Sequence, residues 1–164
     1  MVYPKAFSHI GISVPDIEKA VDWYSNVLGF NVLMGPTQND GDDTHIGRLN
    51  KGVFGKDFYK SKVAHLSTSN GIGIELFEFI EPKAKIPENN FEYWKCGTFH
   101  FCLVDPNIEE LAKLIKETGG KVRSSICNLF PDKPYKMVYC EDPFGNTFEV
   151  YTHSYEQFFS NISY

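Results

Sequence analysis

An internal repeat constrains the fold of this chain more than any other feature, because each copy spans about half of the sequence. Each copy begins with a strand-like segment that carries one histidine, His9 in the first copy and His100 in the second. Each copy ends with a strand-like segment that carries one acidic residue among apolar neighbours, Glu75 and Glu149 respectively. An amphipathic pattern with helical spacing follows each histidine. The repeat predicts two similar modules, each of which contributes one histidine and one glutamate.

The order of predicted elements within each copy is one strand, one helix and three further strands. A four-stranded sheet with one helix leaves its second face uncovered. We therefore predict an α+β fold in which two tandem βαβββ modules form a curled mixed-sheet cup with the helices outside. The modules are expected at about 5–81 and 96–153 of a single domain 1–164, with a linker at 82–95 and a C-terminal tail at 154–164.

The boundaries of the predicted elements come from turn and capping residues. Asp16 is the expected N-cap of the first helix, and Asn107 with Glu110 resembles a capping box for the second. We expect the aromatic tail to dock as a helical turn, and we expect the glycine-rich segment Gly35–Lys60 to be a long loop that allows one short helical or strand segment. The predicted strands are Phe7–Val14, Phe30–Met34, Lys62–Thr68, Gly73–Ile80, Thr98–Val104, Val122–Asn128, Tyr135–Glu141 and Thr147–Thr152.

Strand alternation places the two histidines and two glutamates on the faces that the helices leave open, because neighbouring side chains point to opposite faces. The opposite faces of these four strands are almost wholly apolar, as a face packed under a helix requires. A buried carboxylate without a partner costs free energy, so two glutamates that face two imidazoles favour a shared divalent cation. The residues on the open faces, which we expect to bind substrate, are Ser13, Phe77, Phe79, Cys102 and Tyr151.

The remaining histidines, His45, His65 and His153, have no such repeated pattern, and we interpret them as structural. Arg48, Lys51 and Arg123 are the basic residues that we consider as a source of positive charge for a ligand. The net charge of −5 argues against nucleic-acid and membrane partners, and no apolar run approaches the roughly 20 residues that span a bilayer. We expect a cytoplasmic protein with reduced cysteines that binds a small molecule.

Four segments resemble the vicinal oxygen chelate superfamily, which includes glyoxalase I, extradiol dioxygenases and fosfomycin and bleomycin resistance proteins. These segments are HIGISVPDIEKAVDWYSNVLGF, GIELFEF, FHFCLVD and YCEDPFGNTFEVY. The resemblance implies that His9, Glu75, His100 and Glu149 are the ligands of one divalent metal per site. It also implies that the metal chelates two substrate oxygens, and that Glu149, with Glu75 second, transfers a proton.

The resemblance leaves three functions open. A glyoxalase I-like lyase or isomerase with Zn, Ni, Co or Mn is favoured because Glu75 supplies a fourth ligand. An extradiol-type dioxygenase would use Fe(II), and a ligand-binding or resistance module would need no catalysis. Ser13 stands where the bacterial glyoxalase I has an arginine for glutathione, which argues against that co-substrate. We expect a homodimer, and the superfamily allows the site to form within one chain or across the interface.

Overall fold

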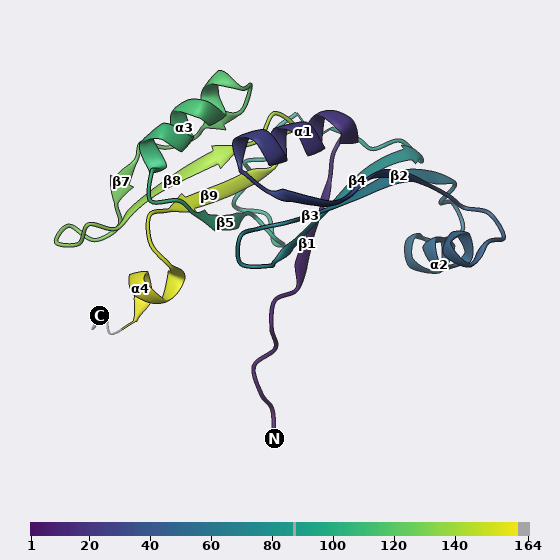
Figure 1. The fold of residues 1–164 in the computed structure, drawn as a ribbon, viewed down its shortest axis with the longest axis horizontal. Helices are drawn as coiled ribbons and strands as arrows, with labels where there is room; N and C mark the ends of the chain where they lie inside the picture. The colour runs from purple at the N-terminus through teal and green to yellow at the C-terminus, as the bar shows by residue number, and fades with distance from the viewer. Residues whose placement is uncertain (87, 161–164) are drawn as a thin grey trace. The chain divides into compact units, whose positions relative to one another are not determined.

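A computed structural model of the chain describes residues 1–86 and 88–160, so the end of the predicted tail, 161–164, lies outside the described residues. The chain divides into two compact units, residues 1–86 and 87–164. Each unit has its own sheet, with one parallel strand pair and otherwise antiparallel pairs. The α+β architecture with two βαβββ-like modules is therefore confirmed (Figure 1). No helix of the described part is long and apolar enough to cross a membrane.

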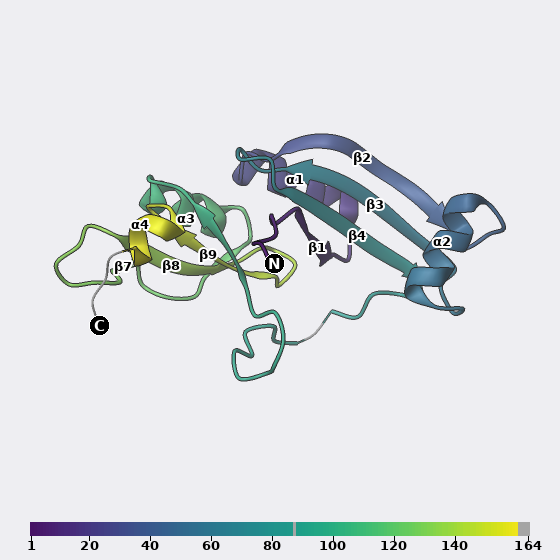
Figure 2. The ribbon, with the colours of Figure 1, turned by 90° about the horizontal axis from the view of Figure 1, so that it is seen from below.

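Unit 1 is a four-stranded sheet with the strand order β1-β4-β3-β2, in which β1 runs parallel to β4. Helix α1 packs against one face of this sheet, and α2 lies at the end of β2, β3 and β4 (Figures 1 and 2). The elements are β1 (His9–Ser13), α1 (Ile17–Val27), β2 (Asn31–Asp40), α2 (His45–Phe54), β3 (Lys60–Ser67) and β4 (Gly73–Glu81).

The first strand and helix of unit 1 follow the predicted pattern. Ile12 and Val14 of the β1 segment are buried, whereas the intervening side chains on the other face are exposed. Asp16 caps α1, because its carboxylate accepts a hydrogen bond from the backbone N–H of Lys19 at 3.1 Å. The apolar stripe of α1 is buried against the sheet, with Tyr24 fully inaccessible to solvent. The core of unit 1 therefore lies between α1 and one face of the sheet.

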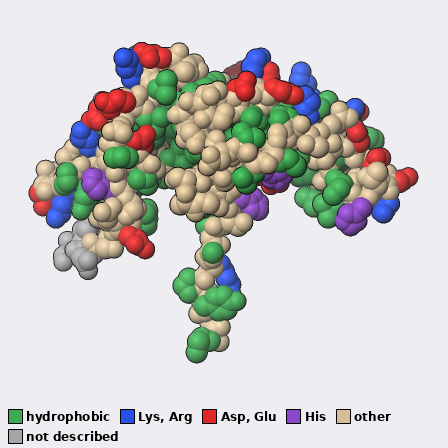
Figure 3. Space-filling model, in the orientation of Figure 1, with side chains coloured by type: hydrophobic (Ala, Val, Ile, Leu, Met, Phe, Trp, Pro, Cys, Tyr) green, Lys and Arg blue, Asp and Glu red, His purple; other side chains and the backbone are tan. Residues whose placement is uncertain are grey.

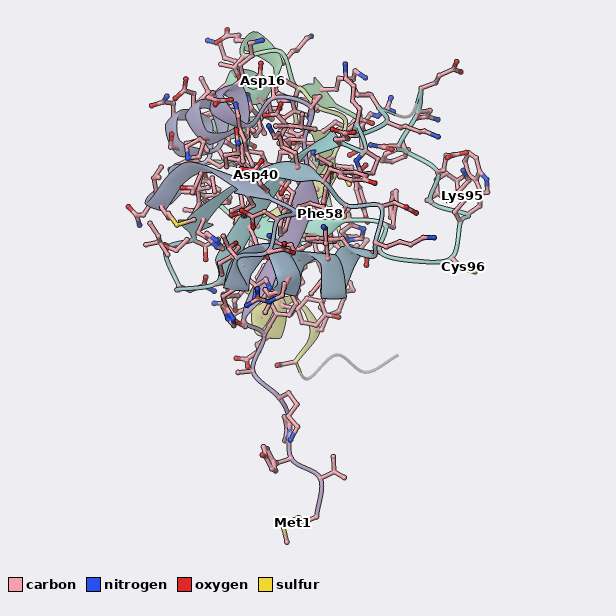
Figure 4. All side chains as sticks on the ribbon, turned by 90° about the vertical axis from the view of Figure 1, so that its right-hand side faces the viewer. Met1, Asp16, Asp40, Phe58, Lys95 and Cys96 are labelled. Carbon is pink, nitrogen blue, oxygen red and sulfur yellow. The ribbon has the colours of Figure 1, made fainter. Side chains whose placement is uncertain are left out.

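Gly35–Lys60 has more regular structure than the long loop with one short helical or strand segment that we predicted. Strand β2 continues to Asp40, and α2 occupies ten residues of the segment. The hydroxyl of Thr44 caps α2 by accepting a hydrogen bond from the backbone N–H of Gly47 at 3.1 Å. Phe58, beside α2 in Figure 4, is only 2% exposed and anchors the return to β3. The glycine content of the segment concealed a capped helix whose stability depends on this buried ring.

Unit 2 has the strand order β5-β9-β8-β6, in which β5 runs parallel to β9 and the short β7 also pairs with β8. Helix α3 packs against one face of this sheet, and α4 lies on the other side (Figure 1). The elements are β5 (Phe101–Val104), α3 (Ile108–Glu117), β6 (Lys121–Val122), β7 (Cys127–Asn128), β8 (Lys136–Glu141), β9 (Thr147–Tyr151) and α4 (Tyr155–Phe159).

Three predictions for unit 2 need correction, and one is confirmed. Strand β5 begins at Phe101, so His100 immediately precedes it, and the predicted strand at 122–128 is divided between β6 and β7. The side chain of Asn107 makes no capping hydrogen bond; its backbone N–H instead donates to the Asp105 carboxylate at 2.8 Å, which orders the turn before α3. The tail does form a helical turn, α4, and its Phe158 is fully buried.

Two turns of the same form lead into the glutamate strands of the two units. In the first, the backbone N–H of Thr68 donates to the carbonyl of Ile72, and in the second Asp142 donates to Asn146. The fourth position of each turn is a glycine with φ near +80° or +90°, a conformation that other residues rarely adopt. The sequence repeat therefore extends to the turn geometry that sets the register of β4 and β9.

We expect Asp142→Ala to lower the free energy of unfolding by about 2–4 kcal/mol, because the carboxylate is buried and organises the turn before β9. It accepts hydrogen bonds from the backbone of Phe144 and from the backbone and side chain of Asn146, at 2.8–2.9 Å. Urea unfolding measures the change. Asp105→Ala is the control, since its carboxylate is more exposed and accepts one such bond, and it should cost about 1 kcal/mol. Equal costs would contradict the assignment.

Candidate functional site

Unit 1 brings His9 and Glu75 together on the face of the sheet opposite α1. The Nε2 atom of His9 lies 3.7 Å from a carboxylate oxygen of Glu75. Gly73 permits this approach, because a Cβ atom there would lie 2.9 Å from the Cβ of His9. The first predicted pair is therefore adjacent in the folded unit.

His65 is a third member of this cluster that our sequence interpretation missed. His65 lies on β3, directly opposite Glu75 of β4, and its Nε2 atom is 3.9 Å from the second carboxylate oxygen of Glu75. The turn at 68–72 could have predicted this neighbour, because His65 lies three residues before the turn and Glu75 lies three residues after it. Glu75 therefore has an imidazole on each side.

Unit 2 brings His100 and Glu149 together in the same way. The Nε2 atom of His100 lies 3.4 Å from a carboxylate oxygen of Glu149. The Nδ1 atom of His100 is buried and has no hydrogen-bond partner within the described part of the chain. Burial lowers the pKa of His100, which favours the neutral imidazole that can bind a metal.

The carboxylate of Glu149 is the most enclosed group of the candidate site, since the residue is only 4% exposed. Burial raises the pKa of Glu149, and hydrogen bonds from Tyr151, Cys102 and Tyr139 partly offset this effect. The Cα atoms of Cys102 and Tyr139 are its direct cross-strand partners on β5 and β8. Glu149 is therefore a buried acid held by three donors.

Two of the three donors were predicted to bind substrate, and the structure places both beside Glu149. Desolvation by its neighbours and the charge of Glu149 raise the pKa of the Cys102 thiol to about 12, so it remains a protonated donor. Tyr151 stacks on Phe158 of α4, with ring centroids 4.1 Å apart, and burial raises its pKa as well. Both side chains therefore donate hydrogen bonds to the Glu149 carboxylate.

The third donor, Tyr139, was not predicted. Its ring lies edge-on to that of His100, with centroids 5.1 Å apart, so it contacts both members of the pair. Like His65 in unit 1, Tyr139 lies three residues before the turn that precedes its glutamate. The two units therefore repeat this placement with different side chains.

The other predicted substrate-binding residues, Ser13, Phe77 and Phe79, lie on the Glu75 face of unit 1. Ser13 is exposed at the end of β1, with Phe77 as its Cα partner on β4. The rings of Phe77 and Phe79 stack with an interplanar angle of 12°, and Phe54 of α2 contacts both. Phe54 was missed because its segment was interpreted as a loop.

Three other residues considered in the sequence analysis make contacts within the fold. His153 packs on Tyr135, and its Nδ1 atom lies 2.8 Å from the hydroxyl of Thr152, in agreement with the structural interpretation. Arg123 forms an ion pair with the buried Glu141 at 2.6 Å, and Arg48 donates to the backbone carbonyl of Asp43. The charge of Arg123 is therefore compensated by an acid, whereas Arg48 is held by a backbone carbonyl.

The donor sets of the two pairs fit a divalent metal. Two ligands that each lie about 2 Å from one metal are roughly 3–3.5 Å apart, which is close to the His–Glu separations of 3.7 and 3.4 Å. Imidazole nitrogen with carboxylate oxygen suits zinc, manganese or iron. Within residues 1–86 and 88–160, no group of three or more His, Cys, Asp or Glu side chains is arranged to hold a metal, so neither unit forms a complete metal site with its described residues.

In chelator-treated protein, we expect the contribution of Glu149 to the free energy of unfolding to fall as pH rises above the ordinary Glu pKa of 4.5, because burial raises its pKa and the folded state holds its proton more tightly. Glu149→Gln removes this loss and should stabilise the protein by about 1 kcal/mol or more near neutral pH. Thermal unfolding against pH measures the difference. Glu117→Gln, at an exposed position of α3, is the control, and equal pH dependence of both variants would contradict this assignment.

Comparison with known proteins identifies the family of the chain. Residues 6–150 match the model of the glyoxalase/bleomycin resistance protein/dioxygenase superfamily, whereas a search of curated proteins finds no significant match. A glyoxalase family protein from Bacillus cereus superposes with a TM-score of 0.74 at 18% identity, covering 92% of this chain and 97% of that chain.

Two further solved structures show the same fold. The fosfomycin resistance protein FosX from Listeria monocytogenes, as a glutamate-to-glutamine mutant with Mn(II) and a dihydroxypropylphosphonic acid, has a TM-score of 0.58 at 17% identity, covering 94% of this chain and 98% of that chain. A glutamate-to-glutamine mutant of glyoxalase I from Zea mays has a TM-score of 0.60 at 18% identity, covering 90% of this chain and 45% of that chain. By the extent of the family match, the chain belongs to the glyoxalase/bleomycin resistance protein/dioxygenase superfamily.

Proposed function

We propose that the protein is a metal-dependent lyase or isomerase of the glyoxalase I-like type, which acts on a small α-hydroxycarbonyl compound or 2-oxo acid derivative. His9, Glu75, His100 and Glu149 would together bind one divalent metal. The two pairs would complete one site, either within a chain or between the chains of a homodimer.

One observation carries this proposal: the two units place a histidine and a glutamate within 3.4–3.7 Å of each other at corresponding positions of a repeated module. A single such pair is a common surface ion pair. A repeated pair, with one carboxylate almost fully buried, requires a reason to retain the buried charge. A shared metal ion provides that reason, because it compensates both carboxylates and both imidazoles.

A bound divalent metal would polarise the substrate carbonyl and stabilise the enolate that follows loss of an α-proton. The side chains of this protein would perform the proton transfer. Glu149 is the best candidate for the base, because burial moves its pKa upward from the ordinary carboxyl range towards the working pH. Tyr139 and Cys102 would orient its carboxylate. Glu75 is the second candidate, since its side chain is more exposed, at 26%.

The structural relatives support metal chemistry in this fold without naming the substrate. The Listeria FosX structure contains Mn(II), and the maize structure is a glyoxalase I. Ser13 in the present chain offers no positive charge to a glutathione carboxylate. We therefore propose a substrate without glutathione, and a metal chosen from Zn, Ni, Co and Mn.

We expect His9→Ala and His100→Ala each to weaken binding of the metal by about 100-fold or more, because each removes one of four ligands. Elemental analysis after dialysis against the metal measures this loss. His153→Ala is the matched control and should retain full metal content. Full metal content in both site variants would exclude the proposed ligands, and oxygen-labile iron in the wild-type protein would favour the dioxygenase.

Mixing the two ligand variants distinguishes a site within one chain from a site between chains. If each site takes His9 from one chain and His100 from the other, co-refolded His9→Ala and His100→Ala chains will regain metal in half of the sites of a mixed dimer. If each site forms within one chain, the mixture will bind no more metal than the separate variants.

We expect Glu149→Gln to slow exchange of the α-protons of hydroxyacetone with D2O by about 10²–10⁴-fold, because it removes the base while keeping the size of the side chain. Proton NMR of the metal-loaded enzyme measures the rate. Glu75→Gln in parallel tests the second candidate for the base. Glu117→Gln is the control, and an unchanged rate in Glu149→Gln would assign the proton transfer to another group.

A further inference from the structure

We propose that unit 1 binds an aromatic ring of the substrate against Phe77 and Phe79, in contact with Phe54 of α2. This makes the substrate an aryl-substituted α-hydroxycarbonyl compound. The inference rests on the proposed function, because it places the reacting carbons at the Glu75 and His9 end of the same sheet face. It adds the class of substrate, which the proposed function leaves open.

The arrangement of the three phenylalanine rings forms a surface for a planar group. Phe77 and Phe79 are nearly parallel, with centroids 5.6 Å apart, and both are partly exposed. Phe54 meets them edge-on, at 77° and 81°, with centroid separations of 5.9 and 5.2 Å, and is itself 42% exposed. A further ring can pack on this cluster in the stacked and edge-to-face geometries that aromatic groups prefer.

The aromatic surface lies at a suitable distance from the metal-binding pair. Residues on one face of a strand are spaced by about 7 Å, so Phe77 follows Glu75 at roughly the length of a phenyl ketone. Gly11, the Cα partner of Glu75 on β1, has no side chain, and even a Cβ atom there would only touch Phe77 at 3.6 Å. A substrate ring that packs on Phe77 would therefore place the oxygens attached to that ring's side chain beside Glu75.

Lys62 and Glu78, the charged residues next to Phe77 and Phe79 along β3 and β4, belong to the other face of the sheet. Lys62 forms an ion pair with Glu18 of α1 at 2.7 Å, and Glu78 accepts a hydrogen bond from the backbone N–H of Ile17 at 3.1 Å. Phe77 and Phe79 of β4 have Val63 and Ser61 of β3 as their Cα partners. These partners carry no charge that could compensate a phosphonate, a diphosphate or a peptide carboxylate. A neutral ring is the ligand that this surface matches.

The test compares two neutral α-hydroxyketones that differ only in the group beside the carbonyl, 2-hydroxyacetophenone and hydroxyacetone. Calorimetry gives the Kd of each for metal-loaded and for chelator-treated protein. We expect the phenyl compound to bind about ten-fold more tightly or better in the wild type. Phe54→Ala and Phe79→Leu should reduce this preference to about three-fold or less. Leu49→Ala should retain it, because Leu49 is 52% exposed on α2, over which Figure 3 shows hydrophobic side chains at the surface.

The outcomes separate the aromatic site from the proposed function. Equal affinity for the two ketones, or a preference unchanged in Phe54→Ala and Phe79→Leu, overturns the aromatic site while metal-dependent binding can persist. A phenyl preference that depends on the phenylalanines but is insensitive to chelation and to His9→Ala supports the aromatic site and contradicts the metal mechanism. Phe54 is partly exposed on α2, so its variant remains informative if Phe79→Leu fails to fold.

Discussion

The burial of the Glu149 carboxylate is the constraint on which the organisation of unit 2 depends. A carboxylate that is nearly inaccessible to solvent requires donors, and β5, β8 and β9 each supply one of them. Tyr151 can hold its position because Phe158 of α4 stacks on it. The C-terminal helical turn therefore serves the site as well as the core. Burial of an acid is costly for a stable fold, and groups with such shifted pKa values are common at functional sites.

The turns before β4 and β9 determine which side chain faces each glutamate. Both turns have the same hydrogen bond between their first and fifth residues, so the residue three positions before the turn pairs with the residue three positions after it. In unit 1 this rule pairs His65 with Glu75, and in unit 2 it pairs Tyr139 with Glu149. The repeat therefore conserves geometry while the chemistry diverges. At this cross-strand position Glu75 faces the imidazole of His65, whereas Glu149 faces the phenol of Tyr139.

Unit 1 differs from unit 2 chiefly in the segment that contains α2. In unit 2 the chain passes from β6 to β8 through the short strand β7. In unit 1 the connection from β2 to β3 instead includes the capped helix α2, which Phe58 anchors. This helix places Phe54 on the two aromatic residues that continue the Glu75 face. One unit thus has an aromatic surface beside its His–Glu pair, and the other has a buried acid.

The sequence alone determined the modular fold, the strand faces and the members of both His–Glu pairs, because alternation along a strand is a local property of the backbone. The buried stripes of α1 and α3 and the Asp16 cap followed from the same local rules. The α2 helix, the contacts of Phe54 and the hydrogen bonds of Tyr139 were decided by tertiary structure. A short glycine-containing helix gains its stability from packing that its own residues do not encode. The pKa of Glu149 likewise depends on how completely three strands and α4 exclude water from one carboxylate.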